Sequence, residues 1–227
     1  MMRIVRQVLT ITAKDLRAEL RTKEAINASF AFALVILLMF SFAFDPQEET
    51  TREIAGGLLW IVFPFAGTLI LNRSFARELP NDCLDALISA PISGAVLFVG
   101  KTLANYILVF AVELVSLPVF AIFYGVHLMQ HIGQLLMVLA LGTWGMTVIG
   151  TIFSALTVNI RLREVMLPML TYPILVPVLM GCMLLTKGLV NGQPIGPDTQ
   201  DWLKMLIGFD VMFTAVSLIL VETVLVG

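Results

Sequence analysis

Two acidic residues lie inside long apolar stretches of the chain. Glu113 falls within residues 96–124, eleven positions before their end, and Asp210 falls seven positions into residues 203–226. An ionised acid near the centre of a bilayer costs about 2.5–3.5 kcal/mol on insertion scales, so such residues face protein or water. The pair is therefore either a polar lining of an outward-facing cavity or a set of protonated acids hydrogen-bonded between helices.

Two histidines, His127 and His131, are spaced i, i+4. On a helix this spacing would place two imidazoles against one metal ion or a haem iron. No cysteine or carboxylate lies between or beside them, and we favour the other interpretation, polar side chains at the water interface. The chain also lacks the His-Glu metalloprotease and Gly-x-Ser-x-Gly motifs. We predict no metal site and no catalytic residues.

The stretch "GAVLFVGKT", residues 94–102, is similar at first sight to a phosphate-binding loop. Five residues separate its glycines, whereas the P-loop has four, and it leads into an apolar stretch with no strand before it. We therefore predict that the chain binds no nucleotide itself. We expect Lys101 to extend its side chain to the membrane surface instead.

The composition indicates where these residues are placed. Of 227 residues, 59% are hydrophobic and 13% are charged, whereas soluble domains carry about 25% charged residues. A transmembrane helix needs about 20 mostly apolar residues. Six stretches qualify, at residues 26–44, 54–71, 96–124, 132–158, 165–186 and 203–226. We predict an all-α integral membrane protein in which residues 1–227 form one domain with six transmembrane helices.

Positive charges are divided unequally between the two sides of these spans. Eleven Lys and Arg residues lie on the side of the N-terminus: Arg3, Arg6, Lys14, Arg17, Arg21, Lys23, Arg73, Arg77, Lys101, Arg161 and Arg163. The other side has three, namely Arg52, Lys187 and Lys204. The positive-inside rule places the N-terminus, and with six spans also the C-terminus, in the cytoplasm.

Residues 1–25 precede the first span. Apolar residues fall near one helical face and basic residues fall largely on others; the apolar ones are Ile4, Val8, Ile11, Leu16 and Leu20. A basic amphipathic helix of this kind lies in the membrane interface rather than crossing it. The alternative is a solvated helix with incidental apolar residues.

The segment of residues 73–95, between the second and third spans, contains the polar stretch "ELPNDCLDALISAP", residues 78–91. Leu84, Leu87 and Ile88 share one side of a short helix. Asp82 and Asp85 lie near the start of that helix, where its dipole stabilises negative charge. So small a ridge suits a groove on a partner protein. The alternative is a helix that rests on its own bundle or on lipid headgroups. The residues predicted to couple the chain to such a partner are Glu78, Asp82, Leu84, Asp85, Leu87 and Ile88.

The fifth span contains three prolines, Pro168, Pro173 and Pro177. Each proline removes a backbone donor and crowds the preceding turn, so we expect this helix to be bent or broken. Such a helix is typical of a moving bundle or a lined pathway. Before the third span, Ser93 is placed to cap that helix.

The order of "AKDLRAELRTKE", "LNRSFARE", "LISAPIS" with "GKTLAN", and "GTIFSAL" with "RLREVMLPMLTYPILVPVL" resembles the CcmB family of haem exporter membrane proteins of cytochrome c maturation. The resemblance covers nearly the whole chain, and the proline run is its most specific part. It implies a six-span permease bundle of the ABC-2 type with no ATPase domain of its own.

The resemblance also implies partners and a location. They are a cytoplasmic ATPase subunit (CcmA-like) that binds the ATP, membrane subunits (CcmC-like and CcmD-like), a periplasmic haem chaperone acting indirectly, membrane lipid, and a second copy of the chain in the bacterial inner membrane. Haem would be transported or handed over rather than bound as a cofactor. No nucleic acid partner is expected. The alternatives are an ABC-2 permease exporting a lipid, drug or polysaccharide, and a membrane scaffold without transport activity.

Overall fold

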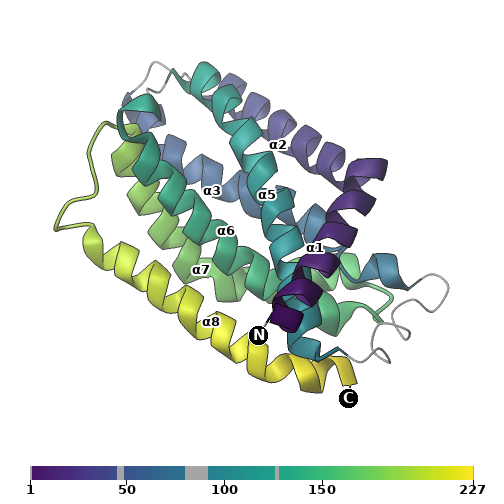
Figure 1. Ribbon diagram of the computed structural model, residues 1–227. Helices are drawn as coiled ribbons and strands as arrows, with labels where there is room; N and C mark the ends of the chain where they lie inside the picture. Colours follow the sequence, from purple (N-terminus) through teal and green to yellow (C-terminus); the bar gives the residue numbers. More distant parts are fainter. Residues whose placement is uncertain (1, 45–48, 80–91, 126–127, 227) are drawn as a thin grey trace.

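The computed structural model describes residues 2–44, 49–79, 92–125 and 128–226. Within these ranges the chain forms seven α-helices and two short 3-10 helices (Figure 1). In chain order they are α1 (Met2–Thr22), α2 (Glu24–Ala43), α3 (Glu49–Leu71), η1 (Ala76–Glu78), α5 (Gly94–Tyr124), η3 (Leu128–His131), α6 (Ile132–Thr157), α7 (Arg163–Val190) and α8 (Gln200–Val226).

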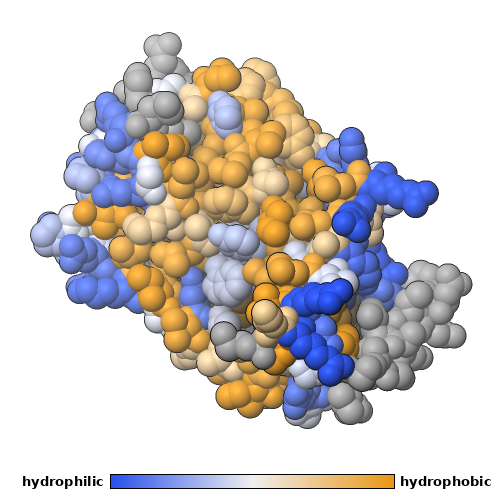
Figure 2. All heavy atoms as spheres, in the orientation of Figure 1, coloured by the Kyte–Doolittle hydropathy of each residue, from blue (hydrophilic) through white to orange (hydrophobic). Residues whose placement is uncertain are grey.

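Six of these helices, all except α1, are long and apolar enough to cross a membrane. This confirms the prediction of an all-helical protein with six spans, and the chain is a multi-pass membrane protein. Several helices are longer than the apolar stretches alone: α3 begins at Glu49 and α7 continues to Val190. Figure 2 shows the apolar surface across the middle of the bundle and hydrophilic residues towards its two ends.

Helices α3 and α6 form the centre of the bundle. In each, 72% of an 18-residue apolar stretch of the helix is buried inside the bundle, whereas the share is 22% in α2 and 28% in α8. A close approach at Gly142 of α6 makes this packing possible, because a Cβ atom there would lie 2.2 Å from the Trp60 ring. The Trp60 indole donates a hydrogen bond of 2.9 Å to the Thr186 hydroxyl on α7. Packing therefore joins α3 to α6, and a hydrogen bond joins α3 to α7.

Helix α1 does not join the row of spans but crosses one end of the bundle (Figure 1). Val8 and Ile11 are buried against α5, where a Cβ atom at Gly100 would lie 2.8 Å from the Ile11 Cβ. The Thr12 hydroxyl donates to the Gly100 carbonyl at 3.0 Å. We call the end of the bundle that α1 crosses the α1 end. Helices α3, α6 and α8 end there, and α2, α5 and α7 begin there.

The three prolines of the fifth span do not interrupt it. Pro168, Pro173 and Pro177 all lie inside α7, which is one helix from Arg163 to Val190. Of the two outcomes expected from the sequence, a break is therefore wrong. Transmembrane helices tolerate proline because neighbouring groups satisfy the carbonyls that it leaves free.

The stretch that is similar to a phosphate-binding loop forms the first turns of α5. Ser93 caps this helix, as predicted: its hydroxyl accepts a hydrogen bond from the Val96 N–H at 3.4 Å. Beyond the first turn, helical N–H groups bond to carbonyls within the helix and are not free to wrap a phosphate.

Candidate functional site

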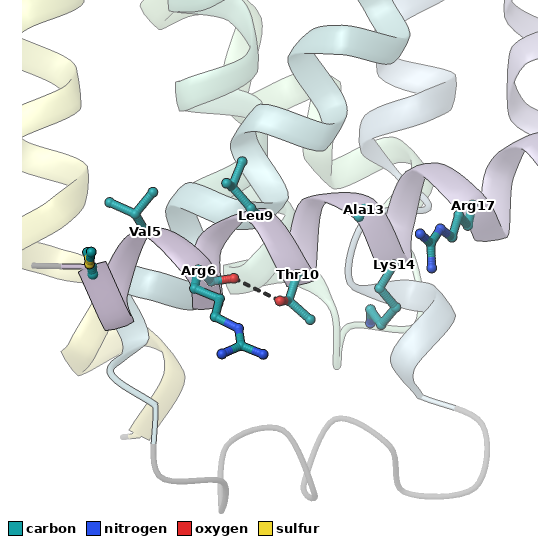
Figure 3. Close-up of a pocket in the computed structure, with 8 residues that line it drawn as sticks. Val5, Arg6, Leu9, Thr10, Ala13, Lys14 and Arg17 are labelled. Atoms are coloured by element: carbon teal, nitrogen blue, oxygen red, sulfur yellow. Dashed lines mark hydrogen bonds between the residues drawn. The ribbon is translucent and has the colours of Figure 1, made fainter.

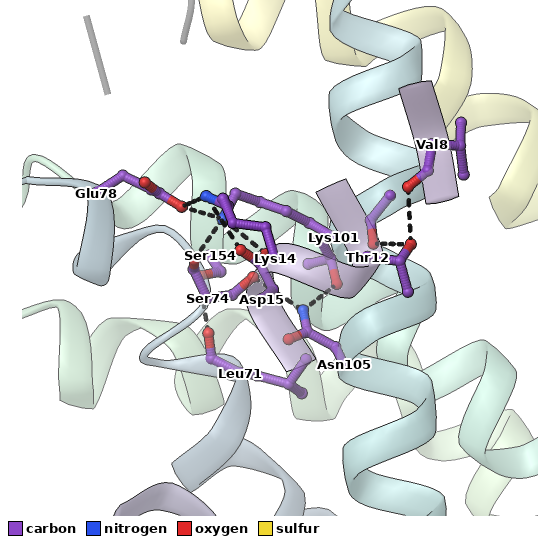
Figure 4. A network of polar contacts seen from close by, with 12 residues as sticks. Val8, Thr12, Lys14, Asp15, Leu71, Ser74, Glu78, Lys101, Asn105 and Ser154 are labelled. Carbon is purple, nitrogen blue, oxygen red and sulfur yellow. Dashed lines mark hydrogen bonds and ion pairs between the residues drawn. The ribbon is translucent and has the colours of Figure 1, made fainter. Parts of the chain in front are cut away.

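A buried lysine lies at the centre of the polar contacts at the α1 end. Lys101 of α5 has no exposed side-chain surface, and its ammonium donates three hydrogen bonds. The acceptors are the Ser74 carbonyl at 2.8 Å, the Glu78 carboxylate at 3.0 Å and the Asp15 carboxylate at 3.2 Å (Figure 4). It also lies 4.9 Å from the centre of the Phe75 ring. We call Lys14, Asp15, Ser74, Glu78 and Lys101 the Lys101 cluster.

The expectation that Lys101 reaches the membrane surface is wrong. Helix α1 lies across the first turns of α5 and brings Asp15 to the ammonium. Glu78 approaches from η1. A buried cation is stable only with well-placed counter-charges, and two carboxylates from two segments provide them here.

Lys14 completes the charge balance of the cluster. Its ammonium pairs with the Glu78 carboxylate and lies 3.1 Å from Asp15. Burial alone would lower the pKa of Lys14, but the hydrogen bond to Glu78 and the charge of Asp15 outweigh it, so the pKa of Lys14 is raised. Two ammonium groups thus share two carboxylates, and the cluster is neutral.

The polar contacts continue from the cluster into the bundle. The Asn105 amide donates to the Ser74 hydroxyl and to the Thr151 hydroxyl, both at 2.9 Å. The Ser154 hydroxyl donates to the Leu71 carbonyl at 2.9 Å. The last residue of α3 is therefore attached to α6, and the turn that follows α3 is attached to α5.

A second set of contacts joins the same turn to the junction of α1 and α2. Glu19 is fully buried, and its carboxylate accepts hydrogen bonds from the N–H groups of Ala25 at 2.8 Å and Ile26 at 2.9 Å. It thereby satisfies two N–H groups that the start of α2 leaves free. Glu19 also pairs with Arg77, and two further residues of these segments, Glu24 and Arg73, pair with each other.

The described part of the segment of residues 73–95 is thus fixed on several sides. Glu78, which the sequence placed among the coupling residues, faces inward and pairs with Lys14 and Lys101. The other predicted coupling residues, Asp82, Leu84, Asp85, Leu87 and Ile88, lie outside the described residues.

The two acids inside the spans both approach α6. The Thr143 hydroxyl of α6 donates to the Glu113 carboxylate at 2.5 Å, so Glu113 is hydrogen-bonded between helices. Asp210 of α8 lies against α6 at Gly145, where a Cβ atom would lie 2.7 Å from its Oδ1 atom. Thr143 and Gly145 are two positions apart and lie on opposite sides of a helix. The two acids therefore contact different sides of α6.

The surroundings of the two acids also differ. Asp210 lines a groove of about 490 Å³ between α6 and α8, whose other lining residues are mostly apolar. Both of its carboxylate oxygens, and Oε1 of Glu113, have no hydrogen-bond partner among the described residues. Glu113 thus makes a contact between helices, whereas Asp210 is buried beside a mostly apolar groove. A polar lining of an outward-facing cavity stays a prediction.

His131 has a structural contact at the opposite end of the bundle. Its Nε2 atom lies 3.1 Å from the Gly192 carbonyl oxygen, which joins the turns before α6 and after α7. His127 lies outside the described residues. In the part of the chain that the structure covers, no three His, Cys, Asp or Glu side chains come together as a metal site would need.

Comparison with known proteins decides the family. The chain matches the family described as "CcmB protein" over residues 6–223. The chain belongs to the CcmB family. Members of this family are permease subunits without a catalytic domain, and the chain is therefore a transport subunit rather than an enzyme.

Relatives match over most of their own length. The chain is 33% identical to heme exporter protein B of Rhodobacter capsulatus over 180 residues, which are 78% of this chain and 82% of the relative. It is 30% identical to the protein of the same name from Paracoccus denitrificans, over 80% of this chain and 84% of the relative. The Haemophilus influenzae protein of that name is 25% identical over 88% and 90%.

Several residues of this CcmB-family chain that make buried hydrogen bonds or ion pairs are not predicted as site residues from the sequence. Asp15, Glu19, Ser74 and Asn105 were not singled out, and Lys101 was assigned to the wrong environment. A signal was present for Glu19, because an acid shortly before an apolar helix can accept its first N–H groups. Asp15 and Lys101 are 86 positions apart, and no local pattern connects them.

Proposed function

We propose that this chain is the membrane permease subunit of an ABC exporter that serves cytochrome c maturation in the bacterial inner membrane. Its work would be to couple ATP hydrolysis by a separate ATPase subunit to haem export, or to release of a haem-loaded periplasmic chaperone. The observation that carries this proposal is membership of the CcmB family over residues 6–223, together with relatives named heme exporter protein B.

The proposal places both termini, and therefore the α1 end, in the cytoplasm. The eleven basic residues counted from the sequence belong to this end, and three belong to the other. Cytoplasmic segments of membrane proteins carry such an excess of Lys and Arg. The ATPase would then approach the α1 end, where the segment of residues 73–95 begins and ends.

The residues of that segment that would contact the ATPase are Asp82, Leu84, Asp85, Leu87 and Ile88. Glu78 would act differently. Its carboxylate is held by Lys14 and Lys101, so it connects the segment to α1 and α5. Arg77 of the segment pairs with Glu19 of α1. Asn105 of α5 bonds both to Ser74 of the segment and to Thr151 of α6. A displacement of the segment by the ATPase would therefore reach α1, α5 and α6 together, because buried ion pairs and hydrogen bonds resist separation.

The mature assembly would contain two copies of the chain, as well as CcmC-like and CcmD-like membrane subunits. Two six-span halves are needed to enclose a pathway, and this chain supplies one. Chemical crosslinking in membranes that hold an active ATPase should give a dimer of the chain. A crosslinked product that is always monomeric under these conditions would contradict the proposal.

Replacement of Leu84 and Leu87 by Asp tests the coupling role. A strain that lacks its own copy of the gene would carry either the wild-type chain or the double variant, and covalently attached haem in its c-type cytochromes would be measured. We expect maturation with the wild-type chain and its loss with the variant at equal membrane abundance. Leu162→Asp, an exposed residue at the same end, is the matched control and should support maturation. Full maturation with the double variant would refute the coupling role.

A further inference from the structure

Helix α1 presents three different surfaces around its axis. At 100° per residue, the buried residues Val8, Ile11 and Glu19 fall in one sector that faces the bundle. Met2, Val5, Leu9 and Leu20 fall in a neighbouring sector about 60° wide, and Arg3, Arg6, Arg17 and Arg21 fall in a third of about the same width. The apolar residues that contact the bundle are thus different from those on the second surface.

The second surface is an exposed apolar strip. Met2 is 86% exposed, Val5 is 52% exposed, and Leu9 and Leu20 are each 57% exposed. In Figure 3, Val5 and Leu9 point towards the level of the spanning helices, whereas Arg6 and Lys14 point away from it. Since the spans lie in the hydrocarbon layer, the apolar strip of α1 faces the edge of that layer.

The charged residues of the third surface are all basic. Both acids of α1, Asp15 and Glu19, lie on the bundle side and are engaged by Lys14, Lys101 and Arg77. None of the four arginines of α1 has an ion-pair partner among the described residues. Where the two surfaces meet, a hollow of about 790 Å³ runs along the helix. It is lined by Met2, Val5 and Leu9 and by Arg6, Lys14 and Arg17.

We propose that this face of α1 is a docking surface for anionic phospholipid. The acyl chains lie on Met2, Val5 and Leu9, and the anionic headgroups lie along the basic surface that contains Arg6 and Arg17. The occupant must combine negative charge with an apolar part at the membrane boundary, and an anionic lipid of the adjoining leaflet has both. Basic side chains next to an apolar strip bind such membranes through the sum of the two contributions. The proposal does not depend on which substrate is exported.

Native mass spectrometry of the full-length chain tests the preference for anionic lipid. Phosphatidylglycerol and phosphatidylcholine are titrated separately into detergent-solubilised protein, and the Kd of the first bound lipid is compared. We expect Arg6→Gln/Arg17→Gln to reduce the preference for phosphatidylglycerol about 25-fold, because each basic group near an anionic surface contributes a factor of about 5. The matched control is Arg161→Gln/Arg163→Gln, which removes two charges from the same end but outside α1. An unchanged preference in the α1 variant, or an equal loss in the control, would overturn the proposal.

Spin labels on neighbouring residues test where the face lies. Labels are attached to Leu9→Cys or Thr10→Cys in a Cys83→Ser background, with the chain reconstituted in vesicles that contain phosphatidylglycerol. Oxygen, which concentrates in the bilayer, should reach the label at position 9, and a water-soluble nickel complex should reach the label at position 10. Equal access of the nickel complex to both would mean that α1 faces water, for instance as a protein-docking surface, and would refute the lipid site.

Discussion

Lys101 and Glu78 form an ion pair of 3.0 Å in which the lysine side chain has no exposed surface. The pair joins the first turns of α5 to η1, which lies in the segment of residues 73–95. Because Glu78 also pairs with Lys14, one carboxylate connects α1, η1 and α5. This arrangement is the basis for the predictions on stability and coupling.

Replacement of Lys101 by Met should destabilise the protein strongly. Removing one partner of a buried ion pair costs about 3–5 kcal/mol, because a buried charge is left without compensation. The midpoint of denaturant unfolding in detergent micelles measures this effect. Lys204→Met is the control, because Lys204 is 71% exposed and its pair with Asp201 is on the surface, where such pairs contribute about 0–1 kcal/mol. Similar losses in the two variants would show that the Lys101 pair is not structural.

The contribution of Glu19 to the stability of the protein should depend more on its hydrogen-bond acceptor than on its charge. A glutamine at this position would still accept hydrogen bonds from the N–H groups of Ala25 and Ile26, whereas an alanine would leave both N–H groups without a partner. Loss of a capping side chain costs about 0.5–2 kcal/mol, so we expect Glu19→Ala to unfold at lower denaturant concentration than Glu19→Gln. If the two variants unfold together, the ion pair with Arg77 is the dominant contribution instead.

Glu113 should tolerate replacement by Gln better than replacement by Leu. A Gln side chain retains an oxygen that accepts from the Thr143 hydroxyl, and Leu removes it. A double-mutant cycle with Thr143→Val isolates this contact, and coupling energies of contacting residues are about 0.5–3 kcal/mol. Cytochrome c maturation is measured for the same set. Equal maturation by the Gln and Leu variants, with no coupling in the cycle, would exclude the hydrogen-bond role.

Changes in pH should not weaken the contribution of Lys14 within the neutral range. Its pKa is raised above 10.5 in the folded protein. A raised lysine pKa gives stability that is fully present below the ordinary value and is lost as pH rises through the folded value. The difference in unfolding midpoint between the wild-type chain and Lys14→Met should therefore stay constant up to mildly alkaline pH and shrink only above the ordinary pKa. A difference that disappears near neutral pH would contradict the pairing of Lys14 with Glu78.

The six spans were predictable because a membrane leaves little choice to the backbone. Long apolar stretches must be helical in lipid, where no water satisfies the peptide groups, and the Ser93 cap follows from a local pattern. The environment of Lys101 was not predictable, since the side chain lies near a helix start where lysines usually reach the surface. Its burial depends on α1 crossing the end of the bundle. That placement arises from tertiary contacts such as Ile11 on Gly100, which no short stretch of sequence encodes.

The interhelical contacts of the two acids were only partly predictable. Periodicity and depth indicated that Glu113 and Asp210 face protein or water, and the structure places both against α6. The choice of Thr143 as the partner of Glu113 depends on how α5 and α6 are aligned along their length. Side-chain spacing within a single helix contains no information about that alignment.

The most direct test of the proposed role is purification of the tagged chain from the membranes of its native host in mild detergent. The account predicts that an ABC ATPase subunit copurifies with the wild-type chain, that the preparation hydrolyses ATP, and that Leu84→Asp/Leu87→Asp removes the ATPase while the chain still inserts normally. A wild-type preparation with no ATPase subunit, obtained from cells that mature c-type cytochromes normally, would contradict it.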